Sequence, residues 1–159
     1  MTEKLQLQPL LFPPGTGLAL SFFDVELGFK ISSADTDGAW ALIEYVAPSK
    51  FVGPPLHWHK VTSECFYVLE GTVTFRMGEQ VFVGEPGAMV YIPAHTLHTF
   101  SNQSDKPARF LTFISPGGFE EYFKELVSLS QAEPSWPPED MGKILALYRK
   151  YDTFLPDEL

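Results

Sequence analysis

The stretch that decides the fold places two histidines on either side of a tryptophan and a glutamate five residues later: Gly53-Pro54-Pro55-Leu56-His57-Trp58-His59-Lys60-Val61-Thr62-Ser63-Glu64. The remaining two histidines of the chain, His95 and His98, also lie close together. In an extended segment, side chains two residues apart point to the same face, so His57 and His59 can direct both imidazoles toward one point. This is how a strand chelates a metal ion.

A glutamate in an apolar strand supports the same interpretation. Glu64 shares its strand face with Phe66 and Val68, which we expect in the core. A carboxylate directed into an apolar interior is costly unless it is paired or bound to a cation. His98 shares a face with Phe100 on a later strand and would supply a third imidazole. For His95 we favour a surface position at the rim.

The amino-acid composition limits the classes of protein to which the chain can belong. The 159 residues favour one domain over 1–159, with 45% hydrophobic and 19% charged residues, which excludes a disordered chain. Eleven Lys and Arg against twenty Asp and Glu give a net charge of −9, which disfavours nucleic acid and anionic membrane surfaces as partners. Cys65 is the single cysteine, and Met1 to Gln8 show no secretory signal, so we expect a cytoplasmic protein.

Short apolar runs separated by turn residues extend over residues 18–115 and predict an all-β sandwich or barrel. Glu70-Gly71 predicts a tight hairpin, and Gly78-Glu79 marks a further reversal. The expected strands are Leu18–Phe23, Leu27–Ser32, Trp40–Val46, Ser63–Leu69, Val73–Met77, Gln80–Val83, Ala88–Ile92, Leu97–Asn102 and Arg109–Ile114.

The spacing of apolar residues changes after residue 115, where a helical extension is expected over residues 116–159. Apolar residues recur at three- and four-residue spacing from Phe119 to Leu129, which predicts an amphipathic helix that lies on the sheet. Three prolines interrupt the pattern, and a second helix is expected from about Glu139.

Two motifs resemble those of the cupin superfamily. The first is the segment Gly53–Gly71, with HxH, a spaced Glu and a Gly; the second is Gly87–Asn102, with Gly, Pro, His and Asn at the family's intervals. The run Phe119–Leu126 is similar to the tail of small quercetin-dioxygenase-like cupins. The chain departs from the family where a motif glycine is replaced by His95, at a turn that can require dihedral angles favouring glycine.

The resemblance implies a jelly-roll β-barrel with two C-terminal α-helices. It also implies one divalent transition metal ion (Fe, Mn, Ni, Co, Cu or Zn) held by His57, His59, Glu64 and His98. The implied reaction is the oxidation or cleavage of a small aromatic or enolic molecule by dioxygen, with Glu64 as the catalytic base. A homodimer, paired through strand edges or the N-terminal segment, is expected from the resemblance as well.

An aromatic-rich interior favours an apolar substrate over a polar one. The residues expected in the core and, for substrate binding, along the cavity are Phe66, Phe75, Phe100 and Phe113, with Tyr91 as a further substrate contact.

Two alternatives remain open at this point. The first is an isomerase or lyase that uses a redox-silent metal as a Lewis acid. A phosphorylated substrate would need cationic groups, and none of the three arginines lies in either motif. The second is a non-catalytic protein that binds a metal and a small molecule.

Overall fold

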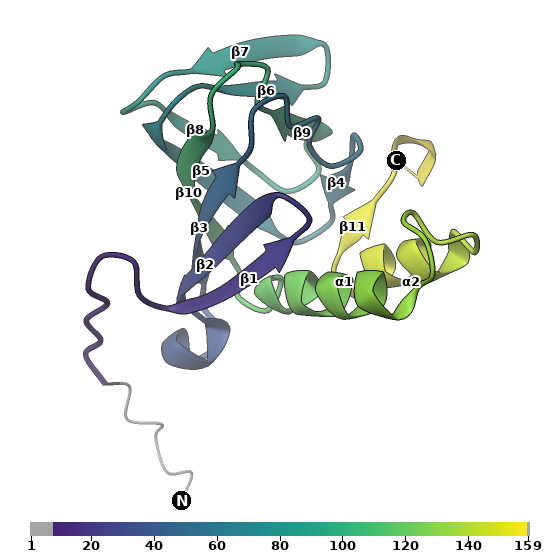
Figure 1. Ribbon diagram of the computed structural model, residues 1–159, viewed down its shortest axis with the longest axis horizontal. Coiled ribbons are helices and arrows are strands. Elements are labelled where there is room, and N and C mark those ends of the chain that lie inside the picture. The colour runs from purple at the N-terminus through teal and green to yellow at the C-terminus, as the bar shows by residue number, and fades with distance from the viewer. Residues whose placement is uncertain (1–7, 159) are drawn as a thin grey trace, which may run out of the picture.

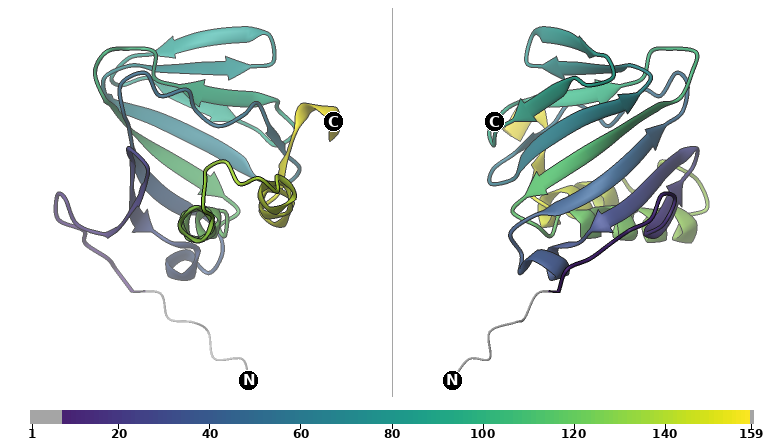
Figure 2. Two further views of the ribbon diagram at one scale, coloured as in Figure 1. Left: turned by 45° about the vertical axis from the view of Figure 1, so that its right-hand side comes forward. Right: turned by 90° about the vertical axis from the view of Figure 1, so that its left-hand side faces the viewer.

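The computed structural model describes residues 8–158, so the segment Met1 to Gln8, for which no secretory signal is predicted, lies almost wholly outside the described residues. Two β-sheets face each other, and two helices lie side by side along one flank (Figures 1 and 2). This is a jelly-roll arrangement, as the sequence predicts, whose sheets are not closed into a continuous barrel. No helix among the described residues is long and apolar enough to cross a membrane.

The larger sheet has six antiparallel strands in the order β1-β2-β3-β10-β5-β8. The smaller one has three in the order β7-β6-β9, and a two-stranded pair joins β11 to β4. The bounds of the strands are β1 Leu18–Phe22, β2 Val25–Ile31, β3 Ala41–Ala47, β4 Trp58–His59, β5 Ser63–Glu70, β6 Val73–Met77, β7 Gln80–Gly84, β8 Met89–Ile92, β9 His98–Ser101, β10 Ala108–Ser115 and β11 Thr153–Phe154.

Both α-helices follow β10 in the C-terminal part of the chain. α1 spans Glu120–Ala132 and α2 spans Gly142–Lys150, with short 3-10 turns η1 (Ser33–Thr36) and η2 (Pro156–Glu158). Both predicted helices are confirmed, although the second begins at Gly142 rather than near Glu139. Asp140 Oδ1 accepts a hydrogen bond from the Gly142 backbone N–H at 2.9 Å, which satisfies one of the free N–H groups at that helix start.

Alternation of side chains places the core between the two sheets. On β3 and β5 every second residue is buried, which is the expected pattern for a strand with one face inward. Nine predicted strands are observed within a few residues of their expected bounds. The fully buried large side chains include Leu27, Ile43, Phe66, Val68, Phe75, Ile92, Phe110 and Ile114.

Two predictions about this region were wrong. Glu70-Gly71 is not a hairpin, because β5 pairs with β10 and β8 whereas β6 pairs with β7 and β9; the turn carries the chain from one sheet to the other. Phe113 is not in the core but is 37% exposed, and its ring stacks on Trp40 at 5.1 Å. On β10 it is Thr112 and Ile114 that point inward. The predicted hairpin at Gly78-Glu79, by contrast, is confirmed by the β6–β7 pairing.

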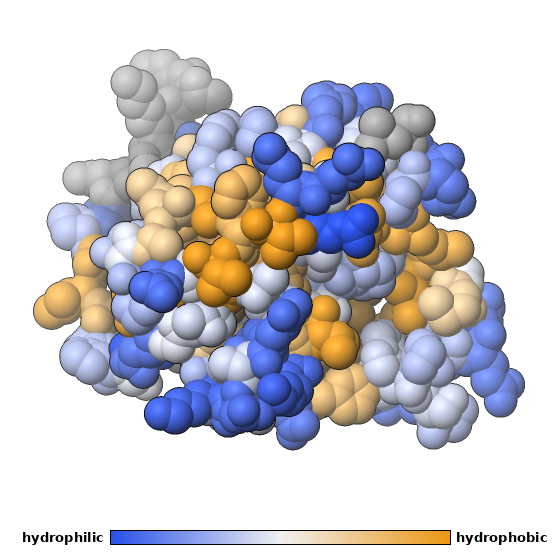
Figure 3. Space-filling view, turned by 90° about the horizontal axis from the view of Figure 1, so that it is seen from above, coloured by the Kyte–Doolittle hydropathy of each residue, from blue (hydrophilic) through white to orange (hydrophobic). Residues whose placement is uncertain are grey.

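The strand β7 forms an exposed edge of the smaller sheet. Its side chains Val81 (61%), Phe82 (44%) and Val83 (64%) are exposed although they are apolar. β7 lies at the top of the fold in Figure 1, and the face seen from above in Figure 3 carries groups of hydrophobic side chains among hydrophilic ones. An apolar edge strand of this kind is a place where another strand can pair.

Candidate metal centre

Three separate segments bring the four predicted ligands together. His59 lies on β4, Glu64 on β5 and His98 on β9. His57 lies just before β4 and forms an isolated bridge with His98, in which each backbone N–H donates to the other's carbonyl at 3.0 and 2.8 Å. The two motifs, about forty residues apart, are therefore joined directly through their histidines.

The four side chains converge on one point. One ligand atom from each of His57, His59, Glu64 and His98 lies within 4.8 Å of the others. All four residues are buried, with exposed fractions of 7%, 2%, 6% and 1%. A cluster of this donor set and compactness is compatible with a metal ion.

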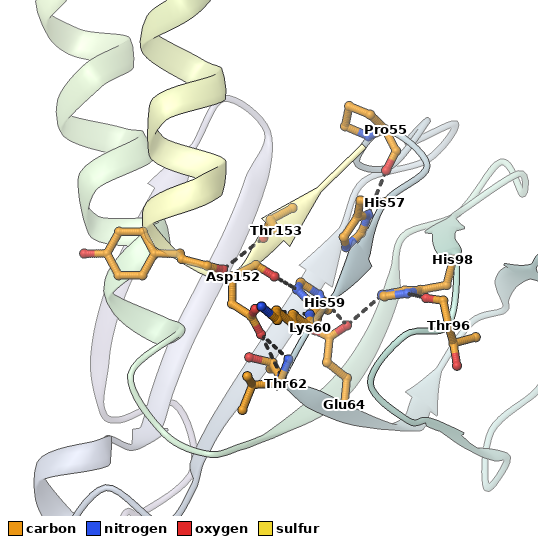
Figure 4. A network of polar contacts seen from close by, with 12 residues as sticks. Pro55, His57, His59, Lys60, Thr62, Glu64, Thr96, His98, Asp152 and Thr153 are labelled. Carbon is orange, nitrogen blue, oxygen red and sulfur yellow. Dashed lines mark hydrogen bonds and ion pairs between the residues drawn. The ribbon is translucent and has the colours of Figure 1, made fainter. Parts of the chain in front are cut away.

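The hydrogen bonds of the three rings fix which nitrogen faces the centre. The Nδ1 atoms of His57, His59 and His98 each lie 2.8 Å from a backbone carbonyl oxygen, of Pro55, Asp152 and Thr96 respectively (Figure 4). A carbonyl oxygen can only accept, so Nδ1 carries the proton in each ring. Nε2 of a neutral imidazole is then a lone-pair donor, which is the state that a metal requires.

The charges around Glu64 agree with this arrangement. Burial would raise the pKa of the Glu64 carboxyl, but the imidazoles of His59 and His98 outweigh burial and hold that pKa well below its ordinary value. Oε2 of Glu64 lies 2.9 Å from Nε2 of His98 and 3.5 Å from Nε2 of His59. Glu64 is thus an ionised carboxylate inside the protein.

One ring nitrogen has no hydrogen-bond partner. Nε2 of His59 is buried and unpartnered among the described residues, although the same ring is anchored at Nδ1. Burial also lowers the pKa of His57 to about 3, which keeps that imidazole neutral. Burial would lower the pKa of His59, but the Glu64 carboxylate and the Asp152 carbonyl outweigh burial and raise it. The buried Nε2 atom thus faces a carboxylate with no hydrogen-bond partner among the described residues, and a bound cation would fit between them in place of a proton. An N3O set of this kind suits several transition metals and does not select one.

Asp152 contacts the cluster although no pattern in the sequence points to it. Its carbonyl anchors His59, and its carboxylate accepts the backbone N–H groups of Lys60, Val61 and Thr62 at 3.1, 2.8 and 2.7 Å. It lies 93 residues after His59. Its contact with the ring uses a backbone oxygen, which no side-chain pattern reveals.

A cavity of about 420 Å³ opens beside the cluster, between the sheets and the two helices. Its wall includes His57 and Glu64, and Glu64 is the only charged side chain that residues 8–158 contribute to that wall. The remaining lining is mostly aromatic and aliphatic: Phe22, Val25, Leu27, Tyr45, Phe51, Gly53, Pro54, Pro55, Phe100, Phe119, Tyr122, Phe123, Leu126, Trp136, Pro137, Met141, Ile144, Leu145, Tyr148, Thr153 and Leu155. The space next to the cluster therefore suits an apolar molecule.

Of the five predicted substrate contacts, Phe100 lines this cavity. Phe66 and Phe75 are fully buried in the core, where Phe66 packs between Phe75 and Phe100 at 5.3 Å from each ring. Tyr91 is 63% exposed and Phe113 lies on the outer face, so neither reaches the cavity lining. Residues of α1 and α2 also line the cavity. Their apolar side chains recur with helical periodicity, and from that periodicity we predicted that the helices pack on the sheet but not that they line a cavity.

His95 occupies the turn where the family has glycine. Its φ is 65°, in the left-handed region, as the sequence suggested for this turn. Its backbone N–H donates to the carbonyl of His59 at 2.7 Å, and its exposed ring stacks on Trp58 at 5.7 Å. His95 is thus a rim residue whose backbone supports His59.

Comparisons with known proteins agree with this geometry. A family model described as "Cupin domain" matches residues 43–114. Quercetin 2,3-dioxygenase of Bacillus subtilis (strain 168) is 28% identical over 120 residues, which are 74% of this chain and 34% of that protein. Probable oxidoreductase virH of Hypocrea virens (strain Gv29-8 / FGSC 10586) is 31% identical over 102 residues, 57% of this chain and 46% of that protein. The chain therefore aligns with less than half the length of these curated relatives.

A solved structure extends the likeness to the fold. KdgF from Halomonas sp. superimposes with a TM-score of 0.63 at 15% identity, over 72% of this chain and 99% of that chain. Ectoine synthase from P. lautus superimposes with a TM-score of 0.56 at 20% identity, over 67% of this chain and 76% of that one. At these identities the likeness concerns the fold alone.

Proposed function

We propose that the chain is a metal-dependent dioxygenase acting on a small aromatic or enolic molecule, because residues 43–114 match a cupin-domain model and the chain is similar to a quercetin 2,3-dioxygenase. His57, His59, Glu64 and His98 would hold one divalent transition metal. The single observation that carries the proposal is that two of these ligands, His57 and Glu64, form part of the wall of an apolar cavity.

A redox-active metal held there supplies the electron transfer that makes the spin-forbidden reaction of a closed-shell substrate with dioxygen accessible. Four protein ligands leave a five- or six-coordinate ion one or two positions for small ligands. The remaining chemistry belongs to the residues of the chain.

Glu64 is placed to accept a proton from the substrate. Glu64 is ionised, so Oε2 is an unprotonated acceptor at neutral pH, and it lies on the cavity wall. Stabilisation of the substrate oxyanion by a bound metal would offset the low basicity of this carboxylate. A substrate hydroxyl beside Oε2 would lose its proton to this carboxylate as it becomes an enolate. The aromatic rings of the wall would hold the substrate and exclude water.

Phenol groups supply the polar contacts of the cavity. Burial raises the pKa of Tyr45 and of Tyr122, which keeps both phenols protonated, and the hydroxyl of Tyr122 interacts with that of Tyr148. A protonated phenol in the lining would donate a hydrogen bond to a substrate oxygen. Tyr148 lines the same wall. Among the described residues, the lining contains no lysine or arginine, which disfavours a phosphorylated substrate and with it the isomerase alternative.

We also propose that sheets and helices act together as one domain, because α1 and α2 supply a large part of the cavity lining. The homodimer stays a prediction. The exposed edge strand β7 is the place among the described residues where we would look for it.

The test is anaerobic reconstitution with Fe, Mn, Co, Ni, Cu and Zn in turn, followed by an oxygen-electrode screen against a panel of flavonols. We expect oxygen uptake with at least one redox-active metal and none with zinc. Isomerisation of a phosphosugar without oxygen would replace the proposal, and saturable flavonol binding without product in a fully metallated sample would reduce the protein to a binding module.

A further inference from the structure

We propose that Asp152, in the C-terminal segment, is a positioning residue that sets the ring orientation of the metal ligand His59. This inference rests on the proposed metal site, and it adds a residue outside both motifs. It begins from the contact between the Asp152 carbonyl oxygen and Nδ1 of His59, at 2.8 Å (Figure 4).

Asp152 holds His59 from two directions. Its carbonyl accepts the ring N–H, while its carboxylate accepts the N–H groups of the three residues that follow His59, Lys60 to Thr62, at 3.1, 2.8 and 2.7 Å. Carboxylate–backbone hydrogen bonds of this kind are charge-assisted and stronger than neutral ones. One residue therefore fixes both the ring and the turn next to it.

The backbone at Asp152 explains why an aspartate suits this position. Its φ is 53°, a left-handed conformation that Asp and Asn tolerate better than other non-glycine residues. This turn follows α2 and reverses the chain, so that Thr153 pairs with His59 and Phe154 pairs with Trp58. The end of α2 is thereby connected within a few residues to β4, which carries His59 of the four-residue cluster.

Trp58 reinforces the same junction. Its Nε1–H donates to the carbonyl of Leu155 at 3.2 Å, and its ring stacks on Phe154 at 4.8 Å. Thr153 and Leu155 also line the cavity. The segment that orients His59 is therefore part of the wall that a ligand would contact.

The consequence is that metal affinity depends on Asp152 although Asp152 is not a ligand. Residues that hydrogen-bond to a metal-ligating histidine contribute roughly 10- to 100-fold in affinity. Asp152→Ala keeps the carbonyl oxygen but removes the carboxylate that holds the turn Lys60 to Thr62. We therefore expect it to weaken Co²⁺ binding by up to about tenfold, the lower end of that range, and to change the Co²⁺ d–d absorption spectrum. Asp152→Asn keeps the backbone preference and one acceptor oxygen, and we expect it to restore most of the affinity.

Asp37→Ala is a matched control. Asp37 is exposed, has φ 54° and ends the 3-10 turn η1, so the same substitution removes an aspartate from the same backbone conformation. We expect Asp37→Ala to bind Co²⁺ like the unaltered chain. Its loss of metal-free stability calibrates how much of the Asp152→Ala effect comes from the backbone.

The experiment is Co²⁺ titration of the full-length chain and the three variants, with the free energy of unfolding of each metal-free protein measured in parallel. Equal Co²⁺ affinity and spectrum for Asp152→Ala and the unaltered chain would overturn the inference, and so would an unaltered chain that binds no Co²⁺. If the unaltered chain binds metal but consumes no oxygen with any substrate, the proposed reaction fails while the role of Asp152 stands.

A second measurement decides the matter if Asp152→Ala does not fold. The ¹⁵N chemical shifts of the His59 ring in the metal-free unaltered chain report its tautomer. We expect a protonated Nδ1, whether or not Nε2 also carries a proton. An unprotonated Nδ1 would mean that the Asp152 carbonyl does not hold the ring and would contradict the inference.

Discussion

Nε2 of His98 lies 2.9 Å from Oε2 of Glu64, and both side chains are buried. A carboxylate in such a position depends on its partners for stability. Replacing His98 with Ala leaves Glu64 with the more distant imidazole of His59 at 3.5 Å. We expect the metal-free His98→Ala variant to fold but to lose about 3 kcal/mol in its free energy of unfolding. Urea denaturation measures this, and the double variant with Glu64→Gln should recover part of the loss; unchanged stability in His98→Ala would show that the pair is not formed.

Glu64→Gln separates the ligand role of Glu64 from its role as a base. The amide oxygen can still face a metal, but it is a poor proton acceptor. We expect metal retention to fall less than in His57→Ala or His98→Ala, while turnover falls more than metal content does. Elemental analysis and oxygen uptake on the same samples make the comparison. Activity per bound metal equal to that of the unaltered chain would make Glu64 a passive ligand.

Gly53 and Gly78 form a second matched pair. Both have positive φ, at 82° and 58°, but a Cβ at Gly53 would overlap the carbonyl oxygen of Phe100, whereas a Cβ at Gly78 meets nothing within 4 Å. We expect Gly78→Ala to cost about 1 kcal/mol and Gly53→Ala at least about 3 kcal/mol, with reduced metal binding because Gly53 leads into His57. Thermal and urea unfolding measure both. Similar losses of unfolding free energy in the two variants would indicate that the backbone at Gly53 and Phe100 can move apart to accept a Cβ.

Glu120 links the start of α1 to the turn η1 and gives stability a defined pH dependence. It is fully buried, and its carboxylate accepts the N–H groups of Ser33 at 2.6 Å and Gly118 at 2.7 Å. Burial would raise the pKa of this carboxyl, but these hydrogen bonds outweigh burial and lower it below the ordinary value of 4.5. Because the folded-state pKa is depressed, the carboxylate stabilises the protein above about pH 4.5, and this contribution is lost as the pH falls through the folded-state pKa.

We therefore expect Glu120→Gln to cost about 1–2 kcal/mol at pH 7, with the difference from the unaltered chain shrinking toward pH 3. Urea denaturation across this pH range is the measurement. Glu121→Gln is the control: its half-exposed side chain pairs with Lys124 on the surface, and such pairs contribute less than about 1 kcal/mol. A Glu120→Gln effect that does not depend on pH would contradict the account.

Trp136 connects the linker between the helices to the first hairpin and lines the cavity. Its ring meets Phe22 edge-on at 5.4 Å. We expect Trp136→Ala to weaken quercetin binding by about three- to tenfold, since one aromatic contact is worth about 0.5–1.5 kcal/mol. Trp40→Ala removes a ring stacked on Phe113 outside the cavity and should leave binding unchanged. Equal effects of the two substitutions, in a fluorescence titration, would place the ligand elsewhere.

The sequence predicted the grouping of the four cluster residues because that grouping depends on side-chain type and short spacing. His57, His59, Glu64 and His98 are distinguished by chemistry and by the two-residue period of strands, and the structure brings them together. β10 was harder, because it has apolar residues on both faces, Phe110 inward and Phe113 outward, and the period alone does not say which face is buried. The junction of β4 with β11 escaped prediction, because two-residue strands leave no periodic pattern and the Asp152 carbonyl contact is independent of residue type.

The central claim is that four buried side chains hold one metal ion, and elemental analysis of purified protein after reconstitution tests it most directly. The account predicts about one metal ion per chain for the unaltered protein, and a substoichiometric amount for His57→Ala and His98→Ala, with both variants still folded by circular dichroism. Unchanged metal content in both variants would contradict it.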